Sequence, residues 1–298
     1  MSYSIQTVDI KDPQVEQQLI NLLQDAFGSP TPVPQGHLYK NTVTSKASGQ
    51  TIFLAAVEDG KIIGCNGYMA TDFTIDGTII PCYQSCWTAT HSRHQGRKIF
   101  MNIMNGAKEV LKEKGAGFIY GLGNDNSHPI LIKKLGFKEI PAIVTRIPNI
   151  PVFRNSYLNN TASLDMEELI SGCFIPVEEQ IFDLKKNTWG NDILEIREGN
   201  SLIWGRLAKK PLKFGINLRY FYLGGMDLKE LKDFPLMMQK IFEKFSVQYV
   251  QVVSAETNKF NALLKNWKSS KINGFILYEL NSGAVEHLNL YYGAIDVF

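Results

Sequence analysis

A run of polar and basic residues precedes a predicted helix. The segment reads His91-Ser-Arg-His-Gln-Gly-Arg-Lys-Ile-Phe100, and apolar residues then recur at helical spacing as far as Lys114. The first N–H groups of a helix lack partners inside it and lie at the positive end of the helix dipole, so they can bind a phosphate. Arg97 and Lys98 add positive charge that suits a doubly charged anion. The alternative is an ordinary helix start with solvated basic side chains.

Four side chains that are near this segment or precede it could act as a general base. They are His91, His94, Tyr83 and Asp72. A histidine in a turn is more often simply exposed to solvent, and we assign no base. Cys86 could serve as a nucleophile, but the sequence offers no activating partner for it.

The cysteines are better explained as buried thiols than as metal ligands. Cys82 and Cys86 are spaced so that a strand would place both on one face. No Cys-x-x-Cys and no clustered histidine pair accompanies them, so packing is favoured and no metal is predicted. Four cysteines are few for 298 residues, which indicates reduced thiols.

The elements that must position these residues follow a readable order. Asp59-Gly60 and Asp76-Gly77 are typical hairpin turns and join three strands. A helix and a short strand come next, so the strands on either side of that helix must run parallel. A second short helix and a further strand complete the pattern. The predicted ranges are 52–58, 61–75, 78–90, 96–114, 117–122, 128–135 and 137–147.

The N-terminal residues predict a strand over 3–8 and then a helix. Asp12 is a suitable N-cap, Pro13 fits the first helical position, and Gly28 ends the helix. Residues 29–50 are rich in Pro, Gly, Ser and Thr and predict a long surface loop.

The second half repeats part of this order. A helix over 228–245, a strand over 247–254, a short helix over 257–267 and a strand over 273–280 follow one another as in the first half, which suggests a divergent duplication. Further strands are predicted over 218–223 and 288–292. Trp204, Tyr220 and Tyr222 could stack on a ring of a substrate, although core packing is the commoner fate of such residues.

Composition narrows the class of protein. The chain has 44% hydrophobic residues and a net charge of +2, with basic residues spread along its length. It is long enough for two domains and carries no basic stripe for a nucleic acid. No segment has the length and apolar character of a signal peptide or membrane span, so we expect a cytoplasmic protein without a membrane partner.

The order of elements, together with His91–Phe100, Asn124-Asp-Asn-Ser127 and Lys133-Lys-Leu-Gly-Phe137, resembles the GNAT superfamily of N-acyltransferases. The resemblance implies an α+β fold. Its mixed, mostly antiparallel sheet has a central splayed parallel strand pair and flanking helices, and a second, degenerate GNAT-like domain follows. We predict domains at 1–148 and 176–298, joined by a linker at 149–175, with the second domain walling the acceptor cleft.

The superfamily binds acetyl-CoA at a turn written Gln/Arg-x-x-Gly-x-Gly/Ala. One register places Gln95, Lys98 and Phe100 on the three defined positions, and another uses Arg93 and Gly96. We prefer the first, in which Lys98 either crowds the phosphates or pairs with them. The resemblance implies these acetyl-CoA contacts: Trp87, Thr88, Ala89, Thr90, Gln95, Gly96, Arg97, Lys98, Ile99, Phe100, Asn126 and Ser127. Ser127 has helix capping as its alternative role.

A further departure affects the chemistry. Many members carry a tyrosine five residues before the Gly-Phe pair, which protonates the departing thiolate, and Ile132 stands there in this chain. The resemblance therefore implies transfer of an acetyl group to a primary amine by direct attack, with another residue or water as the acid. The expected acceptor is a small molecule, an amino sugar for instance, and the expected state a monomer or homodimer. A non-catalytic CoA-binding module is the alternative, and a transferase that takes its acyl group from a charged tRNA is less favoured by the modest charge.

Overall fold

The computed structural model describes residues 3–28, 36, 38, 40, 45–150, 161–212 and 217–295. Most of the predicted loop at 29–50 and residues 151–160 of the predicted linker lie outside this set. The chain divides into two compact units. Unit 1 comprises Met1–Asp72, Ile80–Glu139 and Ile276–Ala284, and unit 2 comprises Phe73–Ile79, Ile140–Phe275 and Val285–Phe298. The predicted domain boundaries at 148 and 175 stay predictions.

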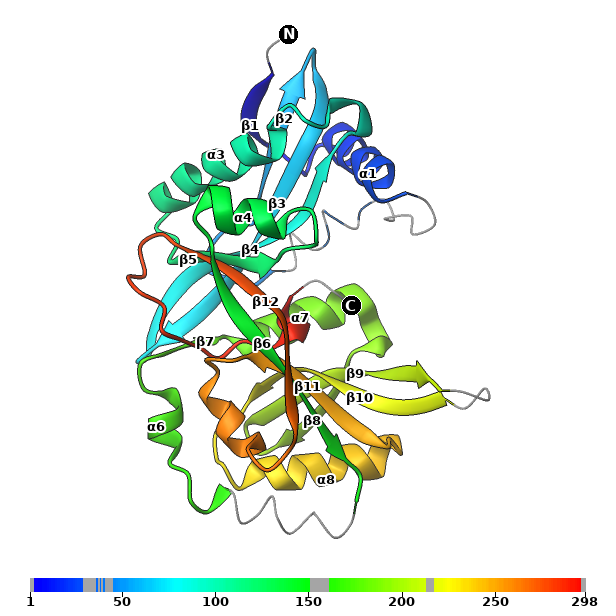
Figure 1. Ribbon diagram of the computed structural model, residues 1–298, viewed down its shortest axis with the longest axis vertical. Helices are drawn as coiled ribbons and strands as arrows, with labels where there is room; N and C mark the ends of the chain where they lie inside the picture. Colours follow the sequence, from blue (N-terminus) through cyan, green and yellow to red (C-terminus); the bar gives the residue numbers. More distant parts are fainter. Residues whose placement is uncertain are drawn as a thin grey trace. The chain divides into compact units, whose positions relative to one another are not determined.

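The sheet of unit 1 follows the predicted strands closely (Figure 1). Its order is β1-β2-β3-β4-β5, and the last part of β12 lies beside β5. The Asp-Gly turns are formed as predicted, because Asp59, Gly60, Asp76 and Gly77 all have positive φ, as two-residue hairpin turns require. The strands are β1 Ser4–Val8, β2 Ile52–Glu58, β3 Lys61–Ile75, β4 Thr78–Thr90, β5 Phe118–Leu122 and β12 Ser269–Glu279.

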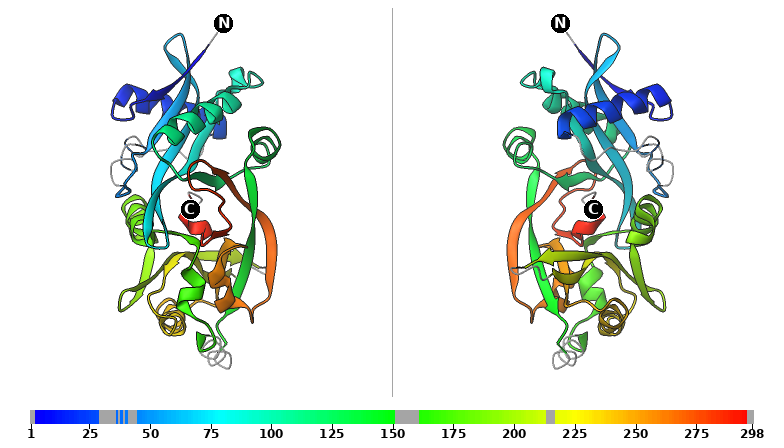
Figure 2. Two further views of the ribbon diagram at one scale, coloured as in Figure 1. Left: turned by 90° about the vertical axis from the view of Figure 1, so that its left-hand side faces the viewer. Right: turned by 90° about the vertical axis from the view of Figure 1, so that its right-hand side faces the viewer.

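Helices cover both faces of this sheet. Helix α1 (Pro13–Phe27) lies on one face, and α3 (Ile99–Glu113) and α4 (His128–Leu135) lie on the other (Figure 2). The Asp12 cap is confirmed, since its Oδ1 accepts a hydrogen bond from the Gln14 N–H at 2.8 Å. Helix α4 has the predicted bounds. The predicted start of the long helix at Gly96 was wrong, because left-handed backbone at Gly96 and Lys98 delays the helix to Ile99.

Unit 2 contains a second sheet region. Its order is β6-β11-β10-β9-β8, and the first part of β12 lies beside β6. Strand β7 pairs with β13 and with the end of β3. The strands are β6 Lys138–Pro148, β7 Cys173–Pro176, β8 Leu194–Glu198, β9 Ser201–Pro211, β10 Asn217–Asp227, β11 Tyr249–Ala255 and β13 His287–Leu288. The helices are α6 Met166–Ile170, α7 Glu178–Trp189 and α8 Asp233–Phe245, with 3₁₀ turns at Gly190–Asp192, Lys259–Leu264 and Tyr292–Ala294.

The predicted repeat is present in the structure. Strand β10, helix α8, strand β11, a 3₁₀ turn and strand β12 follow one another as β4, α3, β5, α4 and β6 do. Strands β10 and β11 are parallel, like β4 and β5. Several predictions for this half were wrong: the helix begins at Asp233, the short helix at 257–267 is a 3₁₀ turn, and the strand at 288–292 ends at Leu288. The strands predicted over 218–223, 247–254 and 273–280 are Asn217–Asp227, Tyr249–Ala255 and Ser269–Glu279. The fold class is the α+β class that the sequence predicts.

Two further properties of the described residues bear on the earlier expectations. All four cysteines are buried and free of disulfides, as predicted, and burial raises the pKa of Cys65 to about 12. Within the ranges given above, no helix is both long and apolar enough to span a membrane.

Candidate acyl-CoA site

The central feature of the site is a gap between two parallel strands. Strands β4 and β5 pair only at Tyr83 with Ile119 and at Gln84 with Tyr120. Their backbones are still close one step further, where a side chain at Gly121 would stand 3.1 Å from the Ser85 carbonyl. From there β4 runs on to Thr90 with no ladder to β5. Its backbone groups on that side can therefore bind an extended ligand, as an added strand would.

A bulge in β4 rearranges side chains beside this gap. Trp87 has φ +48°, and its ring leaves the gap to stack on Phe53 at 5.4 Å, on the α1 face. Because of the bulge, Thr88 and Ser85 both contact Asn66, although residues three apart in a regular strand face opposite sides. Of the predicted contacts on β4, Trp87 thus offers only its backbone. Ala89 is buried, and Thr88 and Thr90 are half-buried.

The turn after β4 leads into an uncapped helix start. Lys98 is the N-cap of α3 with φ +60°, and no side chain of the described residues caps the helix. The first intrahelical bond runs from Asn102 N–H to the Lys98 carbonyl at 3.0 Å, so the N–H groups of Ile99, Phe100 and Met101 have no partner within the helix. The first turn of α3 carries no acidic residue. This geometry is that of an anion-binding helix start.

Left-handed backbone occurs at both Gly96 and Lys98, with φ +79° and +60°, so it does not decide between the two registers. The superfamily's central glycine falls on Lys98 in the preferred register and on Gly96 in the other, and glycine is favoured there because L side chains rarely adopt positive φ. Lys98 takes this conformation without being glycine. Its side chain is exposed, as are Gln95 and Gly96, so the side chain does not plug the helix start. Ile99 is buried in the core beneath α3, and Phe100 packs at the edge of that core.

Arg97 does not contribute its charge to the helix start. Its guanidinium forms two hydrogen bonds with Glu58, at 3.0 and 2.7 Å, and lies 2.7 Å from His94 Nδ1. It also lies over the Tyr3 ring, 5.4 Å from the centroid. The pair lowers the pKa of Glu58 and raises the pKa of Arg97. Arg97 therefore ties the turn to β2 through Glu58, and its contact with acetyl-CoA stays a prediction.

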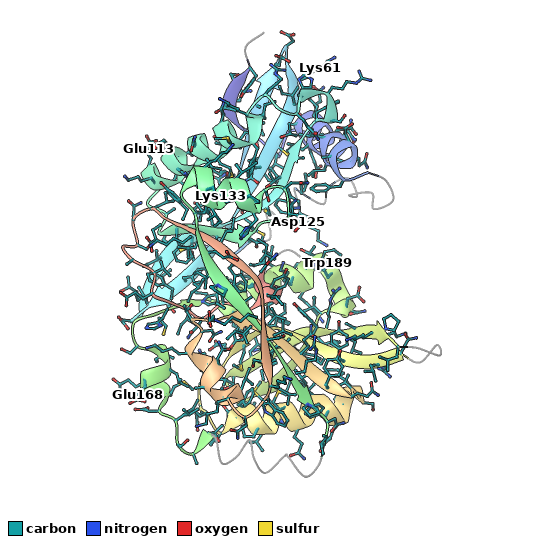
Figure 3. The ribbon with its side chains drawn as sticks, in the orientation of Figure 1. Lys61, Glu113, Asp125, Lys133, Glu168 and Trp189 are labelled. Carbon is teal, nitrogen blue, oxygen red and sulfur yellow. The ribbon has the colours of Figure 1, made fainter. Side chains whose placement is uncertain are left out.

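The loop between β5 and α4 places the remaining predicted contacts, next to Asp125 (Figure 3). Asn124 Oδ1 accepts hydrogen bonds from the N–H groups of Asn126 and Ser127, at 3.0 and 2.9 Å. Ser127 Oγ accepts from Asn124 N–H at 3.0 Å, so it stabilises the loop and does not cap α4. The Asn126 side chain is exposed and makes no hydrogen bond to any described residue, so it is free to contact a ligand.

The structure removes most of the candidate bases from the gap. Tyr83 is buried with α3 and α4, and burial raises its pKa. Asp72 is buried and accepts hydrogen bonds from the N–H and hydroxyl of Ser48, at 2.8 and 2.7 Å. His91 lies against Asp25, with Nδ1 3.7 Å from Oδ2. The Cys86 thiol contacts the Gly67 carbonyl at 3.6 Å.

Two functional candidates were missed in the sequence. Asn66 is fully buried at the bulge, and Gln84 is fully buried at the last rung of the ladder. Both are polar residues within apolar strands. A buried polar side chain needs a hydrogen-bond partner. A polar residue within an apolar strand was therefore the sequence signal that could have identified both residues.

The corresponding gap in unit 2 is filled. Strands β10 and β11 pair from Tyr220 to Tyr222, and the register of β10 then shifts between Leu223 and Gly225. The segment 290–294 lies at this point: Ala255 N–H donates to the Leu290 carbonyl at 2.9 Å, and Tyr291 bridges to Ser254. The 3₁₀ turn after Tyr291 contacts both β10 and β11. The chain itself therefore occupies the second gap.

Trp204 and Tyr220, which could have stacked on a substrate ring, pack against other residues of the protein. Trp204 is fully buried, its ring packs on Gly224, and its Nε1 donates to Glu178 at 2.9 Å. The Tyr220 ring stacks on Tyr249 at 4.8 Å.

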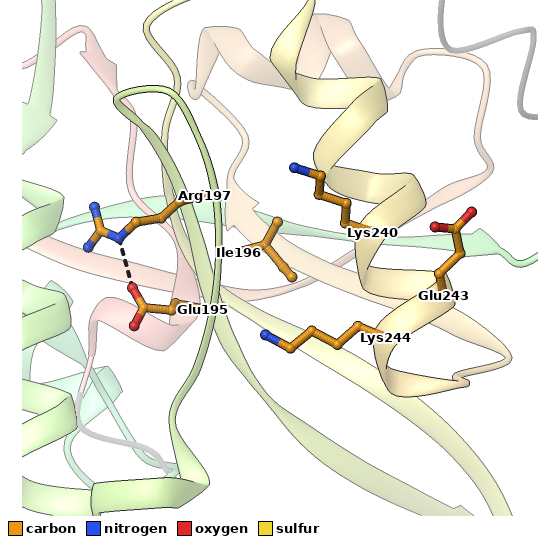
Figure 4. A pocket seen from close by; sticks show the side chains of 6 residues that line it. All are labelled: Glu195, Ile196, Arg197, Lys240, Glu243 and Lys244. Atoms are coloured by element: carbon orange, nitrogen blue, oxygen red, sulfur yellow. Dashed lines mark hydrogen bonds and ion pairs between the residues drawn. The ribbon is translucent and has the colours of Figure 1, made fainter.

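A charged groove between β8 and α8 is a poor candidate for a catalytic site (Figure 4). Its volume is about 510 Å³. Arg197 binds Glu195 at 2.8 Å and Glu179 at 2.7 Å, and Lys240 pairs with Glu198. These ion pairs neutralise the charges of Arg197 and Lys240.

Comparison with known proteins agrees with this geometry. The family described as "Acetyltransferase (GNAT) domain" matches residues 10–140. The first half of the chain is therefore similar to GNAT acetyltransferase domains. No functionally curated protein matches the sequence.

Solved structures extend the likeness to most of the chain. A GCN5-related N-acetyltransferase from Kribbella flavida is similar with a TM-score of 0.63 and 10% identity, over 94% of this chain and 72% of that one. A probable N-acyltransferase from Enterococcus faecalis has a TM-score of 0.60 and 12% identity, over 94% and 73%. Eis1 from Mycobacterium abscessus has a TM-score of 0.57 and 9% identity, over 94% and 74%. At such identities the likeness concerns the fold.

Proposed function

We propose that the protein transfers the acetyl group of acetyl-CoA to a primary amine of a small molecule. One observation carries the proposal: the unpaired edge of β4 leads directly into an uncapped helix start at Lys98. The edge suits the amides of a pantetheine arm, and the helix start suits the diphosphate. The GNAT match over residues 10–140 favours acyl transfer as the use of such a site.

The reaction needs little from the protein beyond binding and orientation. Unpaired N–H groups of β4 beside the bulge can donate to the thioester oxygen as charge develops on it. The amine attacks directly, which requires its unprotonated form. Ile132 stands where many members carry the tyrosine that protonates the thiolate, so water supplies that proton in our proposal. In our proposal the acceptor is a small molecule, an amino sugar for instance, and neither a nucleic acid nor a membrane takes part.

Calorimetry and a thiol-release assay test the proposal together. Acetyl-CoA should bind, and a panel of amino sugars, nucleotide amino sugars, amino acids and polyamines should contain a compound that triggers release of free thiol. Acetyl-pantetheine lacks the diphosphate and should bind far more weakly if the start of α3 holds that group. Binding without thiol release from any amine would support a CoA-binding module instead. No binding would reject both functions.

A further inference from the structure

Gln84 is the most unusual polar residue in unit 1. Its side chain is fully buried, and neither Nε2 nor Oε1 has a hydrogen-bond partner among the residues that the structure describes. Leaving a buried amide unpaired is unfavourable, and an apolar side chain of similar shape would fit better in the free protein. Such a group in a native structure calls for an explanation, and a ligand that completes its hydrogen bonds is one.

The position of Gln84 in the sheet indicates where that ligand lies. Tyr83 and Ile119 face the core under α3 and α4. Side chains alternate along a strand, so Gln84 and its neighbour Tyr120 face the opposite side. Tyr120 OH lies 3.0 Å from Thr71 Oγ1 on that side, which leaves its hydroxyl engaged elsewhere. At the pair formed by Gln84 and Tyr120, the Tyr120 hydroxyl therefore has a partner, and the Gln84 amide has none among the described residues.

The rung of Gln84 is also the closed end of the gap. Strand β4 enters α3 through the turn after Thr90, so a diphosphate at the helix start lies at the open end. The edge from Ser85 to Thr90 is about 17 Å long. A pantetheine arm that binds along this edge of β4 has its acyl end near the position where Gln84 pairs with Tyr120. The core under α3 and α4 fills one face there, and the buried Gln84 amide lies on the other face, where an acceptor that reached the acyl carbon from that side would meet it.

We propose that Gln84 binds the acceptor amine, an inference that rests on the proposed acetyl transfer. Its Oε1 accepts a hydrogen bond from an amine N–H and turns the nitrogen lone pair toward the thioester carbon. The new bond joins that nitrogen to the acyl carbon, and the carbon–sulfur bond breaks with its electron pair on sulfur. The amine then loses a proton to water, and water protonates the thiolate. The neutral Gln84 amide takes no proton at any step.

The test compares Gln84→Met with the wild-type enzyme, using an amine from the panel that the wild type accepts. Methionine keeps the length of the side chain and removes the amide. The KM for the amine should rise about tenfold, because the variant loses one hydrogen bond to the amine. The KM for acetyl-CoA should change less than about twofold. The melting temperature should stay equal or rise. Gln84→Leu repeats the measurement in case methionine packs badly.

Thr145→Val is the matched control, because the Thr145 hydroxyl is buried with a partner, Ser269 Oγ at 2.7 Å. It should lower the melting temperature and leave both KM values unchanged. An unchanged amine KM in both Gln84 variants would overturn the proposal, as would a rise confined to the KM for acetyl-CoA. If the wild type releases no thiol with any amine, the proposed function fails first, and this inference fails with it.

Discussion

Two variants of Lys98 test the helix start, because together they separate the effect of the backbone conformation on stability from the effect of the lysine charge on binding. Lys98→Gly and Lys98→Ala both remove the ammonium group, but only glycine adopts φ +60° without strain. A left-handed L residue costs about 1–2 kcal/mol. The glycine variant should therefore be more stable than the alanine variant by about 1 kcal/mol, which corresponds to about 2 °C in melting temperature for a chain of this size.

Binding of acetyl-CoA should respond to the lost charge in both variants alike. The Lys98 side chain is exposed beside the proposed diphosphate site, so its pairing with a phosphate is worth about 1 kcal/mol, a loss of about fivefold in affinity. The loss should shrink as salt is raised, because exposed charges are screened. Calorimetry at low and high salt measures the affinity, and thermal melts measure stability.

Two results would refute this reasoning about Lys98. Equal stability of the glycine and alanine variants would contradict the left-handed backbone. Tighter binding by the glycine variant would show that the lysine crowds the phosphates and does not pair with them.

Three further predictions concern other parts of the chain. Burial raises the pKa of Glu178 from 4.5 to about 8, so the unfolded chain releases this proton first, and stability should fall by about 1.4 kcal/mol per pH unit between those values. Glu178→Gln keeps an acceptor for the Trp204 N–H and should remove this dependence of stability on pH. Urea unfolding of both proteins at pH 5 and pH 8 measures the free energy of unfolding. An equal loss of stability between the two pH values in the variant and the wild type would contradict the prediction. Calorimetry should give one acetyl-CoA per chain, because residues 290–294 fill the second gap, and two sites would disprove that. Ile132→Tyr should raise kcat by restoring a proton donor for the thiolate, and an unchanged or lower kcat at intact stability would argue that protonation does not limit turnover.

Local signals in the sequence were sufficient for the elements of the first half. The Asp-Gly pairs have the backbone freedom that tight hairpins need, and Asp12 has the side chain that a helix start needs. Gly136 takes the left-handed conformation that ends α4. Each of these features depends on neighbours within a few residues, so the sequence carries them directly.

The parts that were not predicted depend on distant or strained residues. Arg97 pairs with Glu58, which lies 39 positions earlier, and no local sequence pattern predicts that pair. Positive φ at Trp87 and Lys98 is imposed by the surrounding fold, since neither residue favours it. Whether the twelve predicted acetyl-CoA contacts bind the ligand stays a prediction, although the structure gathers most of them around one gap and one helix start.

The strand next to β5 has a consequence for how the protein is made. Its residues, 276–279, come near the end of the chain, and Leu280 N–H donates to the Gly117 carbonyl at 2.8 Å. During synthesis the ribosome therefore releases β5 with one edge bare, and more than a hundred further residues must emerge before that edge is covered. At translation speeds of about 5–20 residues per second, the roughly 150 residues between the two strands leave the edge exposed for about 8 to 30 seconds. Chaperones that shield such edges would matter most in that interval.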